Sequence, residues 1–197
     1  MMLGNTGGFA AAAGRLSARS YVQDGLIAIL DDESGFRSRR TDQLPAFGDS
    51  WTVEICMTFD SWRTSNNGSY FTPDPWVDHI CELYEYPIGS HYINMKTSSG
   101  EWRSSQIQRK GFQTLGCLSD GNGKRSSIFL DGKILATQNS SRPVTSAKVY
   151  RASQVQPTGC IYSSRVYNRA LSAAEIAANH AIDVARFNPN GGGCISA

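Results

Sequence analysis

Aromatic residues gather in the middle of this 197-residue chain, between Trp62 and Trp102. Sugars present flat C–H faces that stack on tryptophan and tyrosine rings, while charged and amide groups hold their hydroxyls. The chemistry that this region could perform is therefore carbohydrate binding, and ordinary packing of the rings is the alternative. The residues best placed for it, on one expected strand face or in polar loops, are Trp76, Tyr84, Tyr86, Trp102 and Arg103.

Paired carboxylates, which glycoside hydrolysis needs, are poorly represented along the chain. The two groups lie roughly 5–9.5 Å apart in such enzymes, which at about 3.3 Å per residue means two positions apart on one strand. Glu54 and Asp60 share a strand face, but the same rise separates them by about 20 Å. Asp31 and Glu33 have the right spacing but read as a polar strand end or loop. Pairs contributed by different strands stay open, and the sequence predicts a protein that is not an enzyme.

The cysteines do not form a metal or redox motif. There are five, without any C-x-x-C pair, and four of them (Cys56, Cys81, Cys117 and Cys160) fall in apolar runs. We expect these four to be reduced core thiols, with Cys194 in a glycine-rich tail. His79 and Cys81 would be about 6.6 Å apart along a strand, which is too far for direct activation of the thiol.

Charge and hydropathy exclude two classes of partner. The formal net charge is +2, and the small basic cluster at residues 37–40 reads as a solvated loop, so nucleic acid is not expected as a partner. No run approaches the roughly 18 apolar residues of a membrane span. The first residues lack the basic flank and long apolar stretch of a secretion signal.

Short strands are predicted along most of the chain. Residues 51–60 alternate between apolar and polar types, which indicates a half-buried antiparallel strand. Residues 21–30 form an apolar run that we read as the first strand. Residues 127–136 carry Asp131-Gly132 between two apolar runs, which predicts a hairpin with a type I′ turn. Weaker strand candidates are residues 77–86, 91–96 and 112–118.

A helix is predicted at about residues 172–186. Ser172 is a good N-cap, Glu175 completes a capping box, and Leu171 and Ile176 can form a hydrophobic staple. One line of the helix carries Ile176, His180, Val184 and Phe187. His180 is expected to be a packed histidine with one polar contact.

The segment TGCIYSSRVYNRALSAAEI at residues 158–176, together with YVQDGLIA at residues 21–28, resembles laminin-G-like, concanavalin A-like domains. The subset that it resembles is common in gut bacteria and their phages. The resemblance covers about residues 21–187 and implies an all-β, two-sheet antiparallel jelly-roll sandwich with a short C-terminal helix. Such domains often bind calcium at a loop rim, and the candidate ligands here are Asp49, Asp74 and Asp120, although no ligand string identifies a site.

The expected organisation is an arm at residues 1–20, the sandwich at residues 21–187 and a flexible tail at residues 188–197. Together with the aromatic-rich middle, the resemblance favours a non-catalytic, lectin-like module that binds a glycan. Its expected setting is a phage virion, or the extracellular space after lysis, as a decoration or fibre component. The alternative is a purely structural virion protein that contacts neighbouring subunits, or further copies of itself, through residues 1–20 and 188–197.

Overall fold

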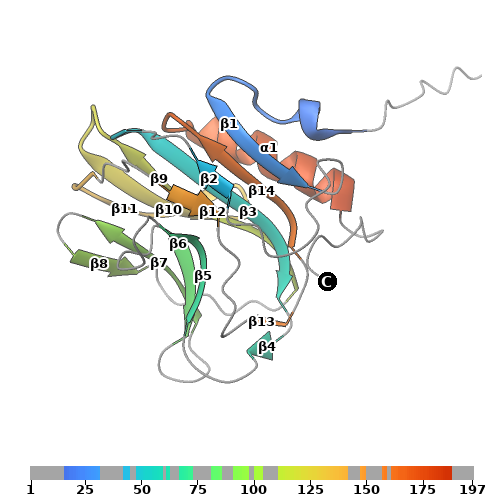
Figure 1. Ribbon diagram of the computed structural model, residues 1–197, viewed down its shortest axis with the longest axis horizontal. Coiled ribbons are helices and arrows are strands. Elements are labelled where there is room, and N and C mark those ends of the chain that lie inside the picture. Colours follow the sequence, from blue (N-terminus) through green and yellow to red (C-terminus); the bar gives the residue numbers. More distant parts are fainter. Residues whose placement is uncertain are drawn as a thin grey trace, which may run out of the picture.

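The computed structural model describes the protein in these ranges: 16–31, 42–44, 48–59, 61–62, 67–72, 81–85, 91–97, 100–103, 111–141, 147–149, 157–158 and 161–187. The described strands form two antiparallel sheets, A and B, and a small separate ladder (Figure 1). Sheet A contains, in spatial order, β1 (Leu26–Asp31), β14 (Ile161–Tyr167), β3 (Trp51–Phe59), β9 (Gly111–Asp120), β10 (Arg125–Leu130) and β11 (Lys133–Gln138).

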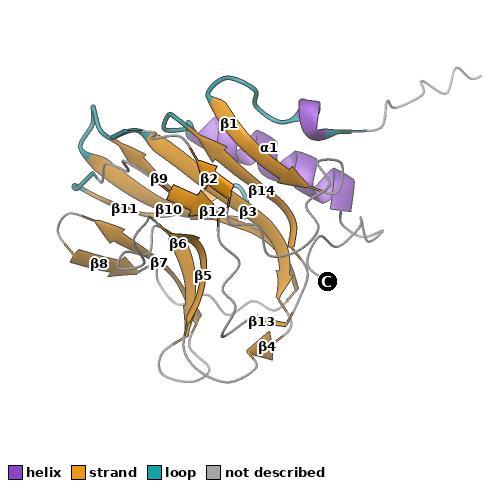
Figure 2. Cartoon of the chain, in the orientation of Figure 1, coloured by secondary structure: helices purple, strands orange, loops and turns teal. Residues whose placement is uncertain are grey.

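Sheet B contains β2 (Asp42–Leu44), β12 (Ala147–Val149), β5 (Asn67–Thr72), β6 (Cys81–Glu85), β7 (His91–Thr97) and β8 (Gly100–Arg103), again in spatial order. The small ladder pairs β4 (Ser61–Trp62) with β13 (Pro157–Thr158). The helical elements are η1 (Ala18–Ser20) and α1 (Ala173–Phe187) (Figure 2). The predicted two-sheet antiparallel jelly-roll with a C-terminal helix is therefore confirmed.

The main core lies between the two sheets. Strand β7 of sheet B packs against β9 and β10 of sheet A, and Ile93 and Met95 of β7 have no exposed surface. Sheet A contributes side chains of one face only, as its register shows: Ile55 pairs with Leu115, and Leu115 with Leu130. The buried apolar residues of this inner face of sheet A are Trp51, Val53, Ile55, Met57, Leu115, Cys117, Ile128, Leu130 and Val166.

Strand β3 departs from the predicted half-buried pattern, because both of its faces are buried. Trp51 and Val53 on the inner face are fully buried, and so are Thr52, Glu54 and Cys56 on the other face. Helix α1 covers that second face of sheet A (Figure 1). The alternation of polar and apolar residues in β3 thus separates two buried interfaces rather than core from solvent.

Helix α1 begins as predicted. The Ser172 N–H donates to Glu175 Oε2 at 2.8 Å, and the Glu175 N–H donates to Ser172 Oγ at 3.3 Å. Leu171 and Ile176 lie in one buried cluster, which confirms the hydrophobic staple. Each bond of the capping box satisfies an N–H that the first turn of a helix leaves without a backbone partner.

The buried face of α1 differs from the predicted apolar line. Two polar residues, Asn179 and Asp183, are fully buried, whereas His180 and Val184 are only half-buried. Ile176 and Phe187 at the two ends of this face are buried as expected. The middle of the helix therefore rests on sheet A through polar groups, which need partners there.

The hairpin between β10 and β11 has the predicted turn. Asp131 has φ 48° and Gly132 has φ 75°, and positive values at both central residues define type I′. Gly116 on β9 faces its partner Phe129 across the ladder, and a Cβ at Gly116 would lie 2.3 Å from the Phe129 ring. Glycine is required at position 116 because this close approach leaves no room for a side chain.

The N-terminal part of the domain begins with a turn, and β1 starts at Leu26 rather than at Tyr21. Gly25 has φ 75°, and the Leu26 N–H donates to the Gln23 carbonyl at 3.1 Å. Arg169 Nε donates to the Asp24 carbonyl at 3.0 Å, which ties this turn to the end of β14. The predicted strand start is wrong because residues 21–25 make these turn contacts instead of extending the ladder.

Candidate functional site

The predicted ligand-binding residues fall into two groups. Trp76 and Tyr86 lie outside the described residues. Tyr84 lies in β6, while Trp102 and Arg103 lie in β8, which ends sheet B. The expectation that Trp102 occupies a polar loop is wrong, because residues 100–103 pair with β7 and form a strand.

The register of sheet B decides which of these positions share a face. Tyr92 of β7 is half-buried, whereas the neighbouring Ile93 has no exposed surface and belongs to the core. Position 84 is paired with Tyr92, and position 103 with Asn94, which is two residues from Tyr92 on the same strand. Positions 84 and 103 are therefore on the face of sheet B that points away from the core, because paired residues share a face.

Further polar positions join this outer face through the same pairing. Position 82 is paired with Asn94, and position 67 is paired with position 84. Together the register brings to this face Asn67, Glu82, Tyr84, Tyr92, Asn94 and Arg103. Position 102 is on the other face, because it is paired with Met95, whose side chain is fully buried.

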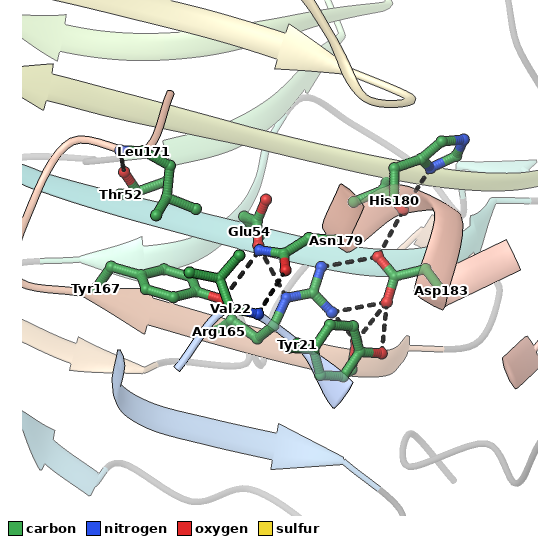
Figure 3. A network of polar contacts seen from close by, with 12 residues as sticks. Tyr21, Val22, Thr52, Glu54, Arg165, Tyr167, Leu171, Asn179, His180 and Asp183 are labelled. Atoms are coloured by element: carbon green, nitrogen blue, oxygen red, sulfur yellow. Dashed lines mark hydrogen bonds and ion pairs between the residues drawn. The ribbon is translucent and has the colours of Figure 1, made fainter. Parts of the chain in front are cut away.

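The polar network beneath α1 is centred on Arg165 of β14 (Figure 3). The side chains of Arg165, Glu54 and Asp183 have no exposed surface. Arg165 Nε donates to Glu54 Oε2 at 2.8 Å. Its two terminal nitrogens donate to the two oxygens of Asp183, at 2.6 and 2.7 Å. One guanidinium therefore joins a strand of sheet A to the helix through a bidentate ion pair, the stronger geometry for such groups.

Asp183 receives further hydrogen bonds from three hydroxyl groups. Tyr21 donates to Oδ1 at 2.7 Å, Ser163 to Oδ1 at 3.3 Å and Thr114 to Oδ2 at 2.8 Å. The Tyr21 ring also lies 4.1 Å from the guanidinium carbon of Arg165, which is a cation–π contact. Tyr21 thereby links the N-terminal turn of the domain to the C-terminal helix α1.

Asn179 connects the remaining members of the network. Its Nδ2 donates to Glu54 Oε2 at 2.8 Å and to the Tyr167 hydroxyl at 2.9 Å. Its Oδ1 accepts a hydrogen bond from the Val22 N–H at 3.0 Å. Because all three contacts fix the orientation of the amide, Asn179 links β3, β14 and the N-terminal turn from one position on α1.

Electrostatics in this network are unbalanced, with one guanidinium beside two carboxyl groups. Burial raises the pKa of Glu54, although Arg165 opposes that effect. Burial alone would lower the pKa of Arg165, but Asp183 and Glu54 outweigh it and hold that pKa well above its usual range. Glu54 Oε1 is buried, and within the described residues it has no hydrogen-bond partner. The two carboxyl groups therefore keep Arg165 charged, while burial favours the protonated form of Glu54.

His180 contacts the edge of the network through Thr114. Its Nδ1 lies 3.1 Å from Thr114 Oγ1, whose hydroxyl proton is donated to Asp183. Thr114 Oγ1 must then accept the bond from His180, so Nδ1 carries a proton. The prediction of a packed histidine with one polar contact is confirmed.

The two buried carboxyl groups come from different elements, the arrangement that the sequence left open. Glu54 lies on β3 and Asp183 on α1, and both are ion-paired with Arg165 away from solvent. In this geometry neither carboxyl group has any exposed surface. Sequence reasoning missed the network, although Asn179 and Asp183 are spaced by three and seven residues from buried Ile176, which is the period of one helix face.

The loops with the candidate calcium ligands are partly described. Gly121 lies against Asp49, and the Gly121 N–H donates to Ser50 Oγ at 3.1 Å, so these two loops are neighbours. Asp120 Oδ1 accepts a bond from the Gly123 N–H, and its Oδ2 lies 3.7 Å from Arg125. In the part of the chain that the structure describes, no cluster of three or more His, Cys, Asp or Glu residues could hold a metal ion. Asp74 lies outside that part.

Two of the cysteines predicted to be reduced core thiols are confirmed as such. Cys56 and Cys117 are buried, and neither forms a disulfide within the described residues. Cys81 lies in β6, and Cys160 and Cys194 lie outside the described residues. Among the helices of the described ranges, none combines the length and the apolar character that crossing a membrane requires.

Comparison with known proteins shows a shared fold. No protein-family model matches the chain, and no curated protein does. A tryptophan-to-alanine mutant of the protein HCR/D is similar in structure with a TM-score of 0.53 and 9% identity, over 80% of this chain and 51% of that one. The heptameric SAP-like pentraxin of Limulus polyphemus has a TM-score of 0.48 and 14% identity, over 71% and 72% of the two chains.

A third similar structure is the CBM40 of Ruminococcus gnavus IT-sialidase bound to alpha2,3 sialyllactose. It has a TM-score of 0.46 and 12% identity, over 78% of this chain and 98% of that one. The chain also matches Trypanosoma rangeli sialidase but spans only 22% of that protein. At 9% identity the HCR/D structure, with its TM-score of 0.53, supports the fold alone, and the specific family, laminin-G-like, stays a prediction.

Proposed function

We propose that this domain is a carbohydrate-binding module and that the outer face of sheet B is its binding surface. The observation that carries the proposal is the register of β6, β7 and β8. It brings two tyrosine positions, 84 and 92, opposite each other, next to the Asn94 position that is paired with both Glu82 and Arg103. Aromatic rings beside amide, carboxylate and guanidinium groups are the set that sugar recognition uses.

The fold supports the same proposal. The R. gnavus CBM40, whose structure this chain resembles, is bound to sialyllactose. Sheet A of the present chain has α1 on its outer face, whereas Tyr92 on the outer face of sheet B is partly exposed. A ligand that lies across several strands needs a face of this kind, which no helix in the described part of the chain covers.

A glycan array with the full chain, run with and without calcium, tests the proposal. We expect binding to at least one glycan class, and we expect Tyr92→Ala to weaken it by roughly 2 kcal/mol if the ring is a hot spot. Tyr92→Phe is the matched control, because it keeps the stacking ring and removes only the hydroxyl. No binding by folded protein in either condition would refute the proposal. Binding that requires calcium would add a metal site to it.

We also propose the setting in which such a module would act, a phage virion on which it is a decoration or fibre component. This part rests on the resemblance of residues 21–28 and 158–176. The segments with which the module would contact other subunits are residues 1–20 and 188–197, of which the structure describes only residues 16–20. Deletion of residues 1–15 leaves η1 and the buried Tyr21 in place. We expect that deletion to abolish incorporation into particles while sugar binding is retained, and normal incorporation would contradict an assembly role.

A further inference from the structure

Strand β11 ends sheet A and presents an exposed apolar pair. Within the described ranges β11 is hydrogen-bonded to β10 on one side only. Ile134 and Leu135 are 42% and 39% exposed, and the only other exposed large apolar residue in the described part of the chain is Leu16. A terminal strand offers a row of backbone N–H and C=O groups that can pair with another strand.

A β-bulge puts both apolar residues at the surface. The register passes from Ile128–Ala136 to Phe129–Ile134, so Leu135 is an extra residue in β11. Phe129 belongs to the buried cluster beneath α1, which places its partner Ile134 on that same face of the sheet. The extra residue takes Leu135 out of the strict alternation that would turn it toward the core between the sheets. Two neighbouring large apolar side chains are thereby exposed at one edge.

The common devices that keep edge strands from pairing are largely missing in β11. The strand reads KILATQ, with one charged residue and no proline, and its charge, Lys133, lies at the first position. Natural proteins blunt exposed edges with several charges, with proline or with a covering segment. Within β11 itself the bulge is the one such feature, and it exposes apolar surface rather than hiding it.

We propose that two copies of this chain associate through their β11 strands, which pair antiparallel about a two-fold axis and join the two A sheets. The charge pattern favours a second copy as the occupant. In an antiparallel pair centred near Leu135, each Lys133 lies opposite uncharged Thr137 or Gln138 of the other strand. The apolar pairs of the two copies then meet at the centre, and such a two-fold contact is self-complementary. This surface belongs to sheet A and is separate from the proposed glycan face, which belongs to sheet B.

Light scattering during size-exclusion chromatography tests this on the full chain over a range of concentrations. We expect the mass of two chains at high protein concentration, and loss of that species in Leu135→Lys and in Ile134→Lys. Ala178→Lys is the matched control, because it adds the same charge at an exposed position of α1 and leaves the edge unchanged. Circular dichroism and the melting temperature verify that each variant is folded.

Hydrogen exchange provides a second measurement that does not depend on a substitution. Backbone amides of β11 should exchange more slowly in concentrated than in dilute protein, while amides of α1 should not change. A wild-type chain that stays monomeric at every concentration would overturn the proposal. That result is expected if β11 pairs with a different protein instead of with a second copy. Dimers that persist in both lysine variants would also overturn it, since the interface would then lie elsewhere.

Discussion

Arg165 and Glu54 lie directly opposite each other on neighbouring strands, with Arg165 Nε 2.8 Å from Glu54 Oε2 and both side chains fully buried. The two residues are 111 positions apart in the sequence, and α1 supplies Asp183 as the second partner of the same guanidinium. The C-terminal helix is therefore joined to the middle of sheet A by ionic groups, in addition to its apolar ends.

Removing the guanidinium should destabilise the domain strongly. Arg165→Met leaves Glu54 and Asp183 buried without a cation, and breaking a buried ion pair in this way typically costs about 3–5 kcal/mol. The measurement is urea unfolding followed by circular dichroism at neutral pH. Arg125→Met is the matched control, because its ion pair with Asp120 is at 3.7 Å and its side chain is 59% exposed. We expect that control to cost under about 1 kcal/mol, and equal losses would contradict the central role of Arg165.

The raised pKa of Glu54 should make part of the stability dependent on pH. A group whose pKa is higher in the folded state contributes stability that is complete below its unfolded pKa, about 4.3. That contribution is lost as the pH rises through the folded value. The stability of the wild-type chain relative to Glu54→Gln should therefore fall as the pH rises above about 4.3. Urea midpoints of both proteins over this range measure the difference, and a difference that grows with pH would show that the sign is wrong.

The capping box of α1 should contribute to stability in the pH range opposite to that of Glu54, above the unfolded pKa of its carboxyl group. Hydrogen bonds from Arg169 and from the cap lower the pKa of Glu175 to about 2. Its contribution is present above the unfolded pKa and is lost as the pH falls toward about 2. Glu175→Gln should reduce the free energy of unfolding at pH 7 by roughly 1 kcal/mol. It should also make the free energy of unfolding depend less on pH in the acid range. Ser172→Ala is the comparison, because it removes the cap without removing a charge. Its stability should therefore depend more steeply on acid pH than that of Glu175→Gln.

Substitutions of Trp102 and of Tyr92 should have different effects on stability and on glycan binding, because the two positions are on opposite faces of sheet B. Position 102 is paired with buried Met95, so we expect Trp102→Ala to lower the melting temperature, in contrast to a ligand-contacting ring in a loop. Tyr92→Ala should change the melting temperature little and reduce glycan binding, because Tyr92 is only half-buried. If Trp102→Ala abolishes binding while the melting temperature is unchanged, the ligand contacts the Trp102 side of the sheet.

Much of the local structure could be predicted from the sequence, because it depends on neighbouring residues. The Asp131-Gly132 turn needs two positive φ angles, which that dipeptide tolerates well. The start of α1 needs a side-chain acceptor and a carboxylate three residues on, and Ser172 and Glu175 supply them. The alternation in β3 likewise identified a strand, since side chains point to opposite faces in turn.

What only the tertiary structure decided is the environment of each face. Polar residues on one side of β3 suggest a solvated face, yet Glu54 is buried there, with its Oε2 accepting hydrogen bonds from Arg165 and Asn179. A strand or helix period shows which residues share a face, but it does not show which distant groups will cover that face. The same holds for sheet B, where the pairing of Trp102 with Met95, rather than its polar neighbours in the sequence, decides on which side it lies. Such contacts depend on register and packing between segments far apart in the chain, and local sequence patterns predict neither of these.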